Sequence, residues 1–134
     1  MTGAEQALCA AVTARLKADA GLQALIGGRV YDEAPAQPTH PYATVGRVQG
    51  RPLPADGGAQ EHLLTLTCVS RYGGKPEARA VVAAMRALLD DAAIELDDHR
   101  LVSLRAAYAD VFRASDEESV LGVLRLRAVT EPLS

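Results

Sequence analysis

The chain has 134 residues, of which 23% are charged and 49% hydrophobic, and this composition is typical of one soluble globular domain spanning the whole chain. Its formal net charge of −3 argues against a general nucleic-acid binder, which needs a basic surface to displace counterions from phosphates. No apolar run approaches the roughly 20 residues that a bilayer requires. Glu5, Arg15 and Lys17 also interrupt any secretory signal. Cys9 and Cys68 are expected to be buried free thiols of a reducing compartment.

The N-terminal third predicts two helices, a short strand, a proline-rich loop and a second strand. Apolar residues at four-residue steps predict a helix over about 2–18. Asp19 is expected to cap a short second helix, which ends at the Gly27–Gly28 pair because glycine accepts the left-handed stop geometry. A strand over 29–31 follows. Three prolines then exclude a helix before the strand over about 42–48, since proline lacks an N–H and fixes φ.

The rest of the chain predicts a loop, a strand, a helix and three more strands, over about 49–60, 62–71, 75–90, 93–96, 100–112 and 120–129 respectively. The last two strands are expected to form an antiparallel hairpin, and the strand–helix–strand order in the middle is consistent with a crossover unit. The predicted fold class is therefore α+β, with a mostly antiparallel sheet and two main helices packed against one side.

Two strand patterns predict which side chains share a face of the sheet. In the last strand, Leu124, Leu126 and Ala128 alternate with arginines, so they are expected to point into the core. In the strand before it, the expected shared face carries Val102, Leu104, Ala106 and Tyr108.

No convergent set of catalytic, cofactor-binding or metal-binding side chains is apparent, so we predict that the chain is not an enzyme. His40, His62 and His99 lie at no helical metal-ligand spacing. The segment 97–99 (Asp-Asp-His) is compatible with half of a metal site or an acid–base pair, but a solvated turn is the better interpretation. The Gly-Gly-Lys sequence at 73–75 lacks the spacing and the hydroxyl residue of a phosphate-binding loop.

Arginines provide the candidate interaction residues. Arg125 and Arg127 share one face of the last strand, and Arg105 is expected beside them on the neighbouring strand of the hairpin. Such a group can bind a phosphate backbone or the acidic residues of a partner, although a solvated outer face is the simpler interpretation. Arg51 and Asp56 are expected to pair in the long loop, whose length suggests that it reaches another subunit or another protein.

Several segments, taken in order, resemble one known family. They are ADAGLQALIGGRVYD with the following P-x-x-P-x-x-P-Y, the strand HLLTLTCVS, the helix start GGKPEA, and the strands LVSLR and GVLRLRA. This order, over about 8–131, resembles the tail-completion or tail-terminator proteins of long-tailed phages.

The resemblance implies a structural protein of a phage-like particle, from a phage, a prophage or a gene transfer agent. It implies a ring, probably a hexamer of this chain, that closes the tail tube and joins it to the head connector while DNA passes through the bore. The expected partners are then further copies of the chain, the major tail tube protein and the connector. Three alternatives remain open: a head-side connector or stopper protein, a small enzyme, and a ligand-binding module.

Overall fold

The computed structural model describes residues 3–54 and 57–133. In chain order, its elements are α1 (Ala4–Ala18), α2 (Ala20–Ile26), β1 (Val30–Tyr31), β2 (Tyr42–Pro52), β3 (Gln60–Ser70), α3 (Gly74–Leu89), β4 (His99–Arg113) and β5 (Val120–Pro132).

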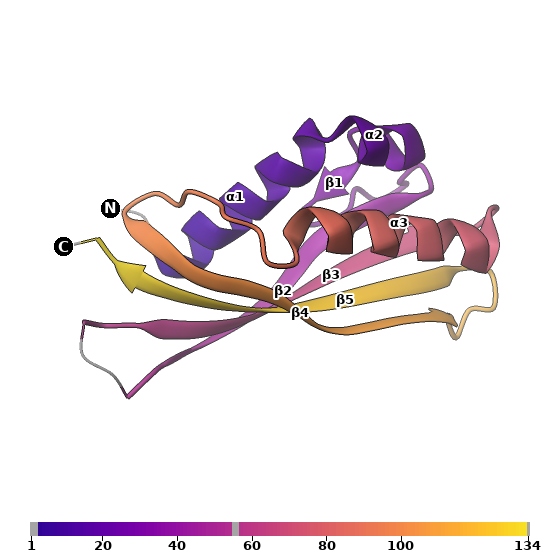
Figure 1. Ribbon diagram of the computed structural model, residues 1–134. Helices are drawn as coiled ribbons and strands as arrows, with labels where there is room; N and C mark the ends of the chain where they lie inside the picture. Colours follow the sequence, from indigo (N-terminus) through magenta and orange to yellow (C-terminus); the bar gives the residue numbers. More distant parts are fainter. Residues whose placement is uncertain (1–2, 55–56, 134) are drawn as a thin grey trace.

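The strands form one sheet in the order β1-β2-β3-β5-β4, in which all neighbours are antiparallel except the short β1–β2 pair. The three helices lie together on one face of this sheet (Figure 1). The α+β class is thus confirmed, with the two predicted main helices, α1 and α3, and the predicted short helix α2 between α1 and β1. The predicted crossover is also present, but β5 lies between the two parallel strands that α3 connects.

The core lies between the helices and the inward side of the sheet. The predicted stripe of α1 is buried, with Leu8, Val12 and Leu16 at most 1% exposed. Asp19 caps α2 as predicted, because its side chain accepts a hydrogen bond of 2.8 Å from the backbone N–H of Leu22. The even-numbered side chains of β5 also point inward, as expected from the alternation.

The predicted loop over 49–60 is too long, because residues 49–52 and Gln60 are paired strand. β2 continues to Pro52 and β3 begins at Gln60, and these two residues are partners in the sheet. The connection is therefore only residues 53–59, closed by a hydrogen bond from Leu53 N to Ala59 O. The described residues of the segment 49–61 form a hairpin arm, which projects beyond the helices at one end of the sheet (Figure 1).

Two further predictions need correction. Residues 93–96 do not form a strand, and only an isolated bridge joins Leu96 to His99. In β4, the four residues expected on one face are split, because register shifts occur at 101–103 and 106–108. Leu104 is consequently 1% exposed, whereas Val102 is 49% exposed. Each bulge inserts an extra residue and reverses the side to which the following residues point.

A buried polar site underlies the root of the hairpin arm. His62 is 0% exposed, and its Nε2 lies 2.9 Å from the Thr130 hydroxyl, while its Nδ1 is buried with no hydrogen-bond partner among the described residues. Glu5 of α1 approaches the same place: a Cβ on Gly50 would lie 2.7 Å from Glu5 Oε1 and 3.2 Å from His62 Nδ1. Burial lowers the pKa of His62 from 6.5, Glu5 opposes this shift, and His99 adds to it.

This lowered pKa predicts a pH-dependent stability. The unfolded chain takes up a proton at His62 near pH 6.5 and the folded chain only at lower pH, so the unfolding free energy should fall as the pH drops below 6.5. The slope from one such group is at most about 1.4 kcal/mol per pH unit. Urea denaturation between pH 7.5 and 5.5 should show a smaller slope for His62→Gln than for the wild type. An unchanged slope in His62→Gln, or an equal loss of slope in the control His40→Gln, would contradict this prediction.

Candidate interaction surface

The face of the sheet opposite the helices is uncovered in the described part of the chain (Figure 1). We call it the open sheet face. Its larger outward-pointing side chains, taken from the register of β2 to β5, include Tyr42, Arg51, Glu61, Leu63, Arg100, Arg105, Tyr108, Asp110, Phe112, Arg125, Arg127 and Glu131. Five arginines thus stand among three carboxylates on this face, although the whole chain carries a net charge of −3.

One carboxylate holds two of these arginines where the hairpin arm leaves the sheet. Glu61 accepts a hydrogen bond of 2.8 Å from Arg51 and one of 2.5 Å from Arg127. Its side chain is 10% exposed, against 71% for Arg51 and 46% for Arg127. The hydrogen bond from Arg127, followed by the one from Arg51, lowers the pKa of Glu61. Arg51 is thus paired with Glu61, whereas the predicted Arg51–Asp56 pair stays a prediction because Asp56 lies outside the described residues.

Arg125 is bound differently. Its guanidinium lies 5.1 Å from the centre of the Tyr108 ring, within the range of a cation–π interaction. Within the described residues, no carboxylate forms a salt bridge with it. Tyr108 donates a hydrogen bond to Asp110, which raises the pKa of the phenol. Arg125 is therefore the arginine of the open sheet face that is freest to pair with a partner.

Arg105 lies directly opposite Arg127 in the β4–β5 register, so the predicted group of three arginines is brought together on one face. Arg105 reaches Asp90 at the end of α3, with Nε 3.4 Å from Oδ1. Asp90 also accepts the backbone N–H of Ala106, and this bond, ahead of the nearby arginines, lowers the pKa of Asp90. Arg100 is paired with Glu131 at the other end of the hairpin.

Glu61, Tyr108 and the apolar side chains of this face were not predicted from the sequence as interaction residues. Leu63 is 42% exposed and Phe112 40% exposed, so the surface mixes arginine with apolar and aromatic groups. Tyr108 could have been predicted as an interface residue, because an aromatic residue near arginines is typical of protein interfaces. Glu61 carried no such signal, since its pairing with Arg51 depends on the register of the hairpin arm.

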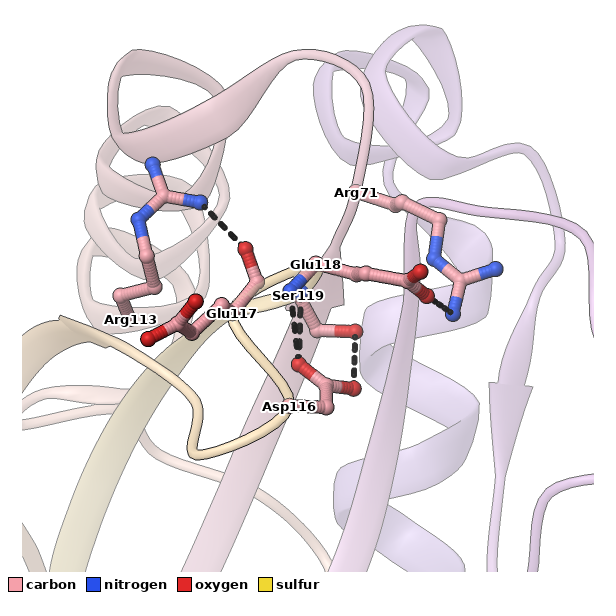
Figure 2. Close-up of polar contacts among 6 residues, drawn as sticks. All are labelled: Arg71, Arg113, Asp116, Glu117, Glu118 and Ser119. Carbon is pink, nitrogen blue, oxygen red and sulfur yellow. Dashed lines mark hydrogen bonds and ion pairs between the residues drawn. The ribbon is translucent and has the colours of Figure 1, made fainter.

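The acidic turn between β4 and β5 is a structural element (Figure 2). Asp116 accepts hydrogen bonds from the backbone N–H groups of Ser119 and Glu118, which lower its pKa, and from the Ser119 hydroxyl. Arg113 donates to the carbonyl of Glu117, and Arg71 at the end of β3 pairs with Glu118 at 3.1 Å. These contacts connect the turn to itself and to the end of β3, so they define its shape.

The side chains considered for chemistry are scattered. His99 bonds the carbonyl of Asp97, while His40 lies between the rings of Tyr42 and Tyr72. Across the described ranges, no three metal-ligating side chains gather in one place. No helix there is both long enough and apolar enough to cross a membrane. Cys68 is a buried free thiol, and burial raises its pKa to about 12, whereas Cys9 is only partly buried.

Comparison with known proteins identifies the family. A model of the family described as "Tail completion protein gp17" matches residues 10–131, which is most of the chain. The chain belongs to this family. A chain of a solved structure titled "Virion of native gene transfer agent (GTA) particle" is 30% identical, with a TM-score of 0.89, and the match covers 98% of this chain and 99% of that one. None of the curated protein sequences matches the chain.

Membership of the tail completion family indicates the kind of protein that carries the open sheet face and the hairpin arm. The family consists of structural phage tail proteins and is not a family of enzymes, so the chain is a structural component of a phage-like particle. The predicted resemblance to tail-completion proteins is confirmed.

Proposed function

We propose that this protein forms a ring, a hexamer of identical subunits, which closes the tail tube of a phage-like particle and joins it to the head connector. DNA passes through the bore of this ring without sequence-specific binding. The whole chain acts as one tail-completion domain. The observation that carries the proposal is the family match over residues 10–131, together with the likeness to a virion chain over 98% of this one.

Two features of the fold support an assembly role. Ring interfaces are heterologous and close after a fixed rotation, so they need two different surfaces on each subunit. The hairpin arm of residues 49–61 is one projecting element, and the open sheet face with Arg105, Arg125 and Arg127 is an uncovered surface. We propose that the arm reaches a neighbouring subunit or the tube protein, and that the arginine face is covered on assembly.

Disruption of the gene tests this function. Cells that make the particle but lack the protein should produce heads and tails that stay unjoined, and negative-stain electron microscopy counts them. Expression of the wild-type protein should restore joined particles. Joined particles at the normal frequency without the protein would contradict the proposal.

A binding experiment separates the leading function from a head-side connector or stopper. Purified protein should sediment with isolated tail tubes that lack it. Sedimentation with DNA-filled heads, and none with tubes, would favour the connector role.

A further inference from the structure

Resting on the proposed ring, we propose which two surfaces of the chain meet between neighbouring subunits. The open sheet face of one copy docks against the acidic segment of residues 91–98 on the next copy. The two surfaces differ, so the contact is heterologous, as a ring of more than two subunits requires.

The composition of the open sheet face fits a protein partner better than a phosphate backbone. Its exposed groups include Tyr108, Phe112 and Leu63, and arginine with aromatic residues is the combination enriched in protein interfaces. Glu61 lies among the arginines and neutralises part of their charge, which a surface built for phosphates would avoid. Arg125, held over the Tyr108 ring, is placed to act as the central anchor.

The acidic segment has the opposite charge. Residues 91–98 carry no lysine or arginine. Their carboxylates are those of Asp91, Glu95, Asp97 and Asp98, all on exposed residues.

The acidic segment is also held in place along the free edge of the sheet. β4 is an edge strand, and the backbone N–H of Asp91 donates to the carbonyl of Leu104 at 2.7 Å. The side chain of Asp90 accepts the N–H of Ala106 at 2.8 Å in the same region. These bonds fix the backbone at the start of the acidic segment, so little ordering of this part is needed on binding.

The two surfaces face different sides of the subunit and adjoin only at its edge, where Arg105 pairs with Asp90. The acidic segment lies at the rim beside β4, on the side of the helices, and the arginine face lies on the opposite side of the sheet (Figure 1). The acidic segment of one copy can therefore bind one neighbouring subunit while the open sheet face of the same copy binds the acidic segment of the other neighbour. Charge complementarity of this kind fixes the orientation of neighbouring subunits.

A charge exchange between two variants tests this contact. The face variant combines Arg125→Glu with Arg127→Gln, the second change being neutral so that no new carboxylate lies against Glu61. The rim variant combines Glu95→Arg with Asp97→Arg, at exposed positions that need no left-handed backbone. Each variant alone should give at least about tenfold fewer joined particles in cells lacking the wild-type gene, because like charges then meet at every contact.

Expression of the face and rim variants together should restore joined particles, because each contact in an alternating ring again pairs opposite charges. A single chain carrying all four changes should also be restored. The matched control reverses two exposed charges elsewhere, Lys75→Glu with Arg79→Glu on α3, and should assemble normally. The melting temperature of every variant is first compared with that of the wild type. If a charge reversal lowers it, the neutral changes Arg125→Gln on the face and Asp97→Asn on the rim are used instead.

Three results would overturn the proposal. Normal assembly by either variant alone would show that its surface lies outside the interface. Loss in both variants without rescue by co-expression would assign the surfaces to other partners, and the tail-joining function would still stand. Joined particles that fail to deliver DNA, seen only with the face variant, would instead place the open sheet face along the path of DNA.

Discussion

Gly122→Ala is expected to lower the free energy of unfolding by about 1–3 kcal/mol, because it overpacks the contact between β5 and α3. A Cβ at Gly122 would lie 2.6 Å from Val82 Cγ2 and 3.4 Å from the carbonyl oxygen of Ala78. Val82 is 6% exposed and Ala78 is 0% exposed, so neither has room to move toward solvent. The helix must therefore shift from the sheet, or the valine must leave its preferred rotamer.

Chemical denaturation of a small set of variants checks this prediction. Val82→Ala should cost less in the Gly122→Ala background than in the wild type, because it removes the methyl group that the new Cβ meets. The expected coupling is about 0.5–3 kcal/mol. Gly28→Ala is the matched control, since no described atom outside its chain neighbours would lie within 4 Å of a Cβ there, and it should change stability little. Equal effects of Gly122→Ala and Gly28→Ala would contradict the tight packing of α3 on β5.

Removal of the end of the hairpin arm is expected to abolish tail joining while leaving the fold intact. Replacing residues 52–60 with Asn-Gly joins Arg51 to Glu61 through a two-residue turn, a type that matches the twist of antiparallel strands. The core should be unaffected, because Arg51 and Pro52 are exposed on the projecting part of the sheet. The Arg51–Glu61–Arg127 group is retained by this design.

The measurement compares the truncated and full-length proteins for thermal unfolding, by circular dichroism, and for joined particles, by complementation of the disrupted gene. The truncated protein should melt within a few degrees of the wild type and give few or no joined particles. If it joins tails as well as the wild type, the arm is not an assembly element. If it does not fold, a shorter deletion of residues 54–58 provides the test.

The parts of the fold that sequence analysis predicted are those with a regular apolar period. Four-residue steps in α1 and two-residue alternation in β5 depend only on local geometry, and both patterns hold in the structure. The faces of the β4 side chains were predicted wrongly, because two bulges shift the two-residue alternation in this strand. The local sequence does not indicate where a bulge occurs.

The hairpin arm was mistaken for a loop because Gly50 and Pro52 read as turn residues. Their positions explain why both are tolerated in a strand. Pro52 is the last residue of β2, where a missing N–H costs little. Gly50 lies where Glu5 and His62 leave little space for a side chain. Both reasons depend on tertiary contacts or on position in the sheet, so local propensity alone predicts a loop where the structure has strand.

The candidate surface was predicted in part. Arg125 and Arg127 follow from strand alternation, and Arg105 from the assumption of a β4–β5 hairpin, which the register bears out. Glu61 could not be predicted as their neighbour, because it lies on β3 and its contact with Arg127 spans 66 residues of sequence. The interface role of these residues stays a prediction.

The central claim is that this protein completes the tail of a phage-like particle. Cryo-electron microscopy of the intact particle tests it most directly, because a five-stranded sheet covered by three helices is recognisable in a map of sufficient detail. The account predicts a ring with six copies of this fold at the end of the tail tube nearest the head, with the hairpin arms directed at neighbouring subunits or the tube. A tail tube that meets the connector without this protein, or the protein located only elsewhere in the particle, would contradict it.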